Sequence, residues 1–187
     1  VFYLPVLELA IPTLRCLSPA QAAGMKRYIQ ALVEADGKLT LFEFVLEKIV
    51  THQLGMGYHH YGRRKIVRQI DPLLPHMVKL LSILAKSGNK TVEEARKAFA
   101  TGFEKLRSAG VTDKASMLER VSFKEVDDAL DRLALAAPTL KRIIFDACCG
   151  CVLYDKKVSI SEAELLRATA SVMDIPVPPF LFHPIKS

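Results

Sequence analysis

The sequence predicts an all-α fold, a single helical bundle spanning residues 1–187, on three observations. Half of the residues are hydrophobic but only 7% are aromatic, a composition that suits the packing of helices. Apolar residues recur at spacings of three and four, and no useful length of chain alternates as a half-buried strand does. Helix-start signals precede most of the apolar segments. At 187 residues the chain is long enough to bury one sizeable core.

Three helices are expected in the N-terminal third of the chain. Residues 1–17 form a short apolar helix that Pro12 interrupts or kinks, because proline cannot donate the helical hydrogen bond. A second helix starts at the capping box Ser18–Gln21, where the hydroxyl and the side-chain amide satisfy each other's backbone. A turn at residues 36–38, with a glycine suited to positive φ, leads to the third helix from Leu41.

Five further helices are expected after residue 70, and each has its own start signal. Gly88 and Asn89 close the first of them, and residues 107–120 are irregular around Gly110. Residues 174–187 form a proline-rich, extended tail. The five start signals are Asp71-Pro72, Thr91–Glu94, Ser122–Glu125, Pro138 and Ser159–Glu162.

An internal repeat relates two helical hairpins, residues about 17–54 and about 136–173. The second lies 119 positions after the first, and no gap is needed to align them. Each hairpin alone would leave an apolar stripe exposed, so we expect the two to pack together as a pseudo-symmetric pair. Such packing would place Ile29 and Ile144 in one core.

The turns of the two hairpins allow two interpretations. Thr40–Glu43 and Ser159–Glu162 both fit a capping box, which makes each glutamate part of a helix start. The same turns match only the second half of an EF-hand loop, and Ca²⁺ needs six or more oxygen ligands. The alternative to capping is therefore a weak Ca²⁺ or Mg²⁺ site, with the candidate ligands Asp36, Glu43, Asp155 and Glu162.

A basic stretch follows the first hairpin, and no acidic residue stands between Glu47 and Asp71. It is either a solvated connection or a contact for phosphate, an acidic protein or anionic lipid. The net charge of +6 permits an acidic partner but does not require one. Nucleic acid is not the expected partner, because the basic run is single and short. The candidate contact residues are Arg63, Arg64, Lys65 and Arg68.

No catalytic constellation is expected in this chain. The His-Glu-x-x-His pattern of zinc peptidases is absent, and Cys149 with His52 or His76 is the one conceivable nucleophile and base. No second CxxC completes a zinc site, so we expect free cysteines packed as small hydrophobic residues in a reducing compartment. The four cysteines are Cys16, Cys148, Cys149 and Cys151. We therefore expect no enzyme and no required cofactor.

The segments DGKLTLFEF and DKKVSISEAELLRA and the PVPP tail together resemble the C-terminal domain of HtpX-like bacterial membrane zinc metallopeptidases. That domain in turn looks like the helical fold of TerB, a tellurite-resistance protein. The resemblance is clearest over residues 4–50 and 130–180. It implies a TerB-like fold, and TerB-like domains are associated with divalent cations through acidic residues, which Asp36, Glu43, Asp155 and Glu162 match loosely.

The resemblance also implies a non-catalytic regulatory or partner-binding domain beside a membrane peptidase. Its partner would be the peptidase domain of the same protein or another protein, with an acidic membrane surface as a further candidate. Zinc would belong to the peptidase domain, which is absent here. No apolar run is long enough to span a bilayer, so we expect a soluble domain at the cytoplasmic face of the bacterial inner membrane.

Overall fold

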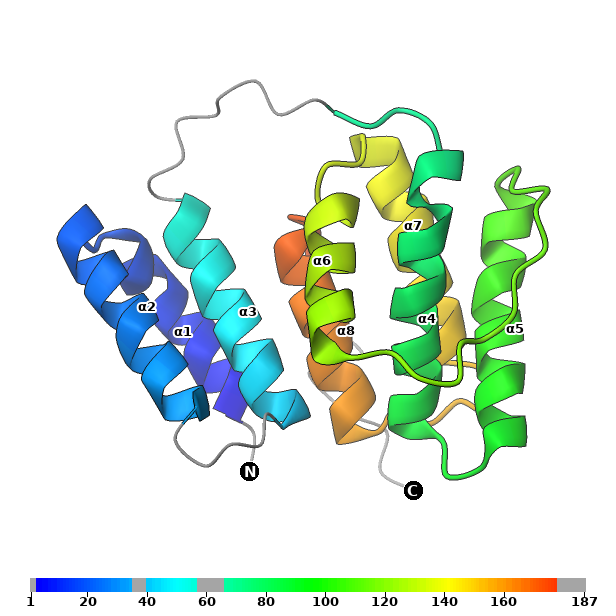
Figure 1. Ribbon diagram of the computed structural model, residues 1–187, viewed down its shortest axis with the longest axis horizontal. Coiled ribbons are helices and arrows are strands. Elements are labelled where there is room, and N and C mark those ends of the chain that lie inside the picture. Colours follow the sequence, from blue (N-terminus) through cyan, green and yellow to red (C-terminus); the bar gives the residue numbers. More distant parts are fainter. Residues whose placement is uncertain (1–2, 35–39, 57–65, 178–187) are drawn as a thin grey trace. The chain divides into compact units, whose positions relative to one another are not determined.

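The computed structural model describes residues 3–34, 40–56 and 66–177, and the regular elements of these ranges are helices (Figure 1). The all-α prediction is confirmed. The chain forms two compact units, residues 1–64 and residues 65–187. The single-domain organisation, the TerB-like arrangement and the packing of the two hairpins on each other stay predictions.

The first unit consists of α1 (Tyr3–Arg15), α2 (Pro19–Glu34) and α3 (Leu41–Met56). Helix α3 packs against both α1 and α2. Helix α1 runs through Pro12 to Arg15, so the helix is not interrupted there. Tyr28 of α2 is 75% exposed, although its helical spacing from Met25 predicts a place on the apolar face. The core of this unit consists of Leu14, Ala22, Val50 and Leu54, with Leu17, Met25, Ile29 and Leu46 packed against them.

The second unit is built around α4, which packs against four other helices (Figure 1). A 3-10 turn, η1 (Asp71–Leu73), precedes α4 (Leu74–Gly88), so the α-helix starts three residues later than expected. The other helices are α5 (Val92–Ser108), α6 (Phe123–Leu133), α7 (Pro138–Val152) and α8 (Ile160–Val172). The apolar side chains that recur at helical spacing along α4 are buried, namely Leu74, Met77, Val78, Leu80, Leu81 and Leu84.

The five capping boxes that the sequence predicts are present. In the box of α5, the Thr91 hydroxyl accepts from the Glu94 amide (3.2 Å), and Oε2 of Glu94 accepts from the Thr91 amide (3.2 Å). The hydrogen bonds of Ser18 with Gln21 follow the same scheme. Since each box satisfies donors that a helix start leaves unbonded, the boxes fix where these helices begin.

The helices of the two predicted hairpins begin at positions that are 119 residues apart in the sequence. Pro19 and Pro138 open α2 and α7, while Leu41 and Ile160 open α3 and α8. The second turn lacks the glycine of the first, and Lys156 takes a φ of 63° there. A residue other than glycine is mildly strained in this left-handed region, so the backbone of the second turn is mildly strained at Lys156. Residues 35–39 of the first turn lie outside the described residues.

Helices α5 and α7 approach each other closely at Gly102. A Cβ atom at this position would lie 2.7 Å from the carbonyl oxygen of Ala147 and 2.8 Å from Cβ of Cys151. The neighbouring turn of α7 offers a second glycine, Gly150, which lies against the alkyl stem of Lys105. Glycine at 102 is therefore what allows these two helix backbones to pack at this distance.

Candidate functional site

The turn before α8 is closed by its own carboxylates. Oδ1 of Asp155 accepts a hydrogen bond from the amide of Lys157 (2.9 Å). Oε2 of Glu162 accepts from the amide (2.8 Å) and the hydroxyl (2.7 Å) of Ser159, and the Glu162 side chain lies against Gly88 at the end of α4. Only 4% of Glu162 is exposed. This carboxyl therefore caps α8 from inside the unit.

The corresponding turn before α3 has the same capping bonds in a more solvent-exposed environment. Oε2 of Glu43 accepts from the amide and the hydroxyl of Thr40, each at 2.8 Å. These bonds lower the pKa of Glu43, because they stabilise the charged form. The pKa of Glu162 is raised instead, because burial penalises the charge more than the Ser159 bonds favour it and because Asp155 repels it. One motif thus exists in two electrostatic settings.

The cation hypothesis stays a prediction. Asp36 lies outside the described residues. Within the ranges that are described, no three His, Cys, Asp or Glu side chains gather as a metal-binding group. Both glutamates among the four candidates, Glu43 and Glu162, engage Oε2 in capping, and Asp155 engages Oδ1 in closing its turn.

The described end of the basic stretch is held in place by backbone bonds. Val67 forms a parallel bridge with Ala136, in which the Val67 amide donates to Leu135 (2.9 Å) and the Ala137 amide donates to Val67 (2.8 Å). On either side of Val67, Ile66 is 56% exposed and Arg68 is exposed. Three candidate contact residues, Arg63, Arg64 and Lys65, lie outside the described residues.

The three cysteines of α7 are free thiols in an apolar setting. Cys148 and Cys151 are buried on the inner face of α7, and Cys149 is half-buried. Burial, with Asp146 nearby, raises the pKa of Cys149 to about 12, and burial with Glu162 nearby raises that of Cys151 to about 12. Burial also raises the pKa of Cys148. A nucleophilic cysteine needs a lowered pKa, so this environment does not support a Cys149 nucleophile.

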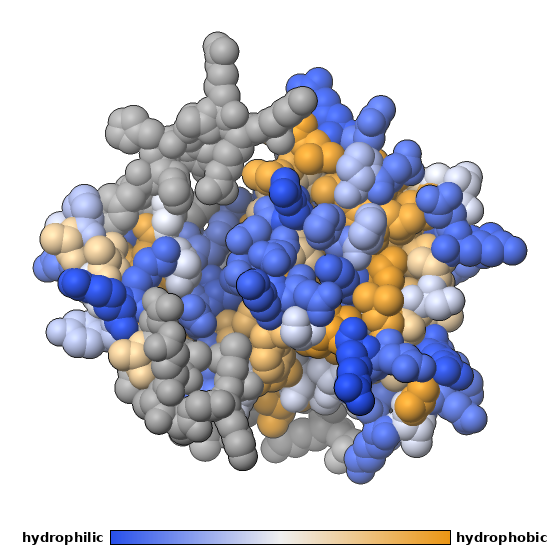
Figure 2. Space-filling model, in the orientation of Figure 1, coloured by the Kyte–Doolittle hydropathy of each residue, from blue (hydrophilic) through white to orange (hydrophobic). Residues whose placement is uncertain are grey.

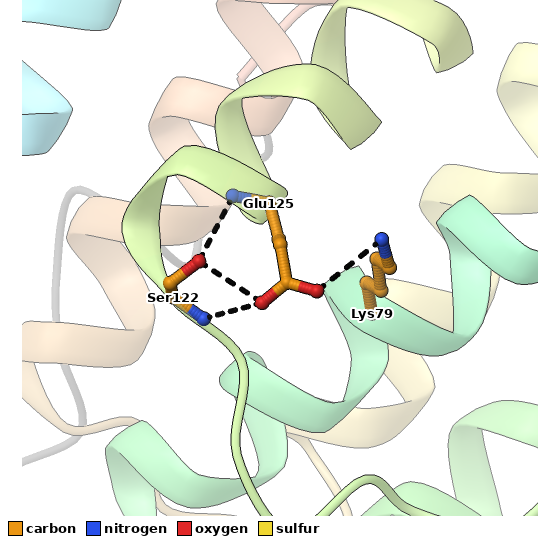
Figure 3. Close-up of polar contacts among 3 residues, drawn as sticks. All are labelled: Lys79, Ser122 and Glu125. Atoms are coloured by element: carbon orange, nitrogen blue, oxygen red, sulfur yellow. Dashed lines mark hydrogen bonds and ion pairs between the residues drawn. The ribbon is translucent and has the colours of Figure 1, made fainter.

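A charged seam joins α4 to α6, and no motif in the sequence predicted it. Glu125, which caps α6 through Ser122, also lies 3.5 Å from Nζ of Lys79 on α4 (Figure 3). His76, one turn before Lys79, is half-buried at the same seam. Burial, followed by the charges of Lys79 and Arg132, lowers its pKa, and Asp128 opposes them. The sequence signal that could have indicated this seam is the spacing of Glu125, Asp128 and Arg132, which places them on one face of a short helix.

No protein-family model, no curated protein and no solved structure matches this chain. The resemblance to the C-terminal domain of HtpX-like peptidases therefore stays a prediction. No helix in the described part of the chain is long and apolar enough to cross a membrane.

Proposed function

We propose that this chain is a non-catalytic, partner-binding helical domain that works beside an HtpX-like membrane zinc peptidase. The observation that supports partner binding best is the anchored segment 66–69. Two backbone bonds fix Val67 to the α6–α7 connection, while Ile66 and the Arg68 guanidinium project into solvent on either side. Because the backbone of this segment is already held in place, less backbone entropy is lost when the exposed apolar side chain and the neighbouring cation meet an acidic protein surface.

The raised pKa values of the α7 thiols support the proposal that the chain is non-catalytic. A thiol whose pKa is about 12 is almost fully protonated at neutral pH, and Cys149 and Cys151 both have this value. Cleavage assays on fluorogenic peptides, with and without zinc, should show no hydrolysis by the purified chain. Zinc-dependent cleavage that disappears on changing His59 or His60 would overturn this part.

The binding part can be tested by site-specific cross-linking in cells of the source organism. A photoreactive amino acid at position 66 or 68 should cross-link to a peptide of a zinc peptidase, identified by mass spectrometry. The same group at the exposed Arg96 of α5 serves as the matched control. Equal labelling from positions 68 and 96, or a target unrelated to peptidases, would contradict the proposal.

Charge reversal separates an acidic protein from an acidic membrane. Arg68→Glu, combined with reversal at Arg63, Arg64 and Lys65, should leave the melting temperature nearly unchanged, because Arg68 is exposed, and should abolish the cross-link. Sedimentation with phosphatidylserine vesicles should be weak for the wild type. Strong, salt-sensitive sedimentation that the reversal removes would point to the membrane surface instead.

A further inference from the structure

The seam between α4 and α6 encloses an imidazole among charged groups. His76 is half-buried, and its Nδ1 atom is shielded from solvent, with no hydrogen-bond partner among the described residues. Lys79 stands one turn further along α4, while Asp128 and Arg132 on α6 are close enough for their charges to act on the imidazole. Helices α5, α7 and α8 also pack against α4, but the charged groups that act on His76 belong to α4 and α6.

Protonation of His76 would be unfavourable in this setting for two reasons. An imidazolium carries an N–H on both ring nitrogens, so the buried Nδ1 would become a donor with no acceptor near it. The new charge would also be repelled by Lys79 and Arg132, and only Asp128 would attract it. Glu125, a further charged group between α4 and α6, is engaged with Lys79 and the Ser122 cap.

We propose that His76 is an acid-sensitive lock on the second unit, which holds α6 against α4 while the imidazole is neutral and loosens α6 when it takes up a proton. The position suits this role, because α4 is the helix around which the unit is built and α6 packs on it directly. The proposal does not depend on which partner the chain binds.

The direction of the effect follows from linkage between proton binding and folding. Burial and the two cations lower the pKa of His76 in the folded protein below its ordinary value of 6.5. The unfolded chain therefore binds the proton more readily than the folded chain does. The contribution of His76 to stability is complete above pH 6.5 and is lost as the pH falls from that value toward the folded pKa.

The test combines proton NMR of the His76 ring with hydrogen exchange of the α6 amides across the pH range. We expect the ring to titrate below 6.5, and exchange protection of α6, corrected for the intrinsic rate, to fall in the same range. His76→Gln should keep α6 protected at the acid end. A ring that titrates at or above 6.5, or protection that falls equally in His76→Gln, would overturn the proposal.

Two exposed neighbours provide variants of opposite sign that keep the imidazole in place. Asp128→Asn removes the attracting charge and should lower the titration midpoint of His76, whereas Arg132→Gln removes a repelling charge and should raise it. The pH at which α6 loses protection should move in the same directions. Because both side chains are exposed, these variants should fold even where His76→Gln does not. If the pH at which α6 loses protection did not shift together with the titration midpoint of His76, the proposed role of His76 would be contradicted.

Discussion

Nζ of Lys79 lies 3.5 Å from Oε1 of Glu125, and Oε2 of the same carboxylate caps α6 through Ser122 (Figure 3). One side chain thus starts a helix and ties that helix to the centre of its unit. The capping bonds, followed by the field of Lys79, lower the pKa of Glu125. Glu162 caps α8 with the same atoms but from a buried position that raises its pKa.

Glutamine at these two caps should therefore change the pH dependence of unfolding in opposite directions. The folded pKa of Glu125 is lowered, so its stabilisation is present above the unfolded value and is lost as the pH falls through the folded one. The folded pKa of Glu162 is raised, so its stabilisation is present at low pH and is lost as the pH rises. In urea unfolding between pH 3 and 8, the free energy of unfolding of Glu125→Gln should fall less than that of the wild type as the pH is lowered. The free energy of unfolding of Glu162→Gln should fall less than that of the wild type as the pH is raised. Changes of the same sign in both variants would contradict this assignment.

Cap removal should cost stability independently of cations. Thr40→Ala and Ser159→Ala each remove an N-cap hydroxyl and should destabilise the protein by about 0.5–2 kcal/mol. Glu43→Ala should lower stability in the same way, since Oε2 of Glu43 bonds the Thr40 amide. Unfolding is to be measured with EDTA, with Ca²⁺ and with Mg²⁺. A loss that appears only with Ca²⁺ or Mg²⁺ would support the cation site in place of the caps.

Two glycine-to-alanine substitutions should have effects of opposite sign. Gly102→Ala places a methyl group against the carbonyl oxygen of Ala147 and should destabilise the protein by about 1–3 kcal/mol, because two helix backbones must separate. Gly24→Ala, in α2, meets nothing within 4 Å and should stabilise by about 0.5–1 kcal/mol. Melting by circular dichroism measures both, and an unchanged melting temperature for Gly102→Ala would show that the α5–α7 contact is looser than described.

Thiol labelling should separate the cysteines by exposure. Cys16 is exposed, whereas Cys148 and Cys151 are buried and the pKa of Cys149 is about 12. In native buffer, Ellman's reagent should modify Cys16 rapidly, and the three thiols of α7 should react only after unfolding in denaturant. Cys16→Ser should remove the fast phase. Rapid native labelling of Cys149, located by mass spectrometry, would reopen the possibility of a thiol nucleophile.

The helix starts could be predicted because their signals are local. A hydroxyl followed three residues later by glutamate or glutamine sets a helix start through bonds within one turn, which is why Ser18, Ser122 and Ser159 were found at the correct positions. The buried face of α4 was predicted for a similar reason, since apolar periodicity directly reports a helix that is packed on several sides.

Features that depend on long-range packing could not be predicted in this way. The burial of Glu162 arises from the end of α4, more than seventy residues earlier in the chain, while Glu43 in the same motif stays more accessible. The His76 environment is assembled from α4 and α6, which are separated in the sequence by α5 and the irregular segment that follows it. Tyr28 has the right spacing for an apolar face and yet is exposed, because a residue at the margin of a helix stripe has no fixed side.

The bridge at Val67 also determines how the second unit would respond to mechanical tension along the chain. A pull on residues ahead of Val67 is first resisted by the two backbone bonds that join this residue to Leu135 and Ala137. On the visible face of this unit, hydrophilic side chains are interspersed with hydrophobic ones (Figure 2). Because both bonds belong to a single residue, they should break together. The bridge between Val67 and the α6–α7 connection would then open before the helices of the unit separate.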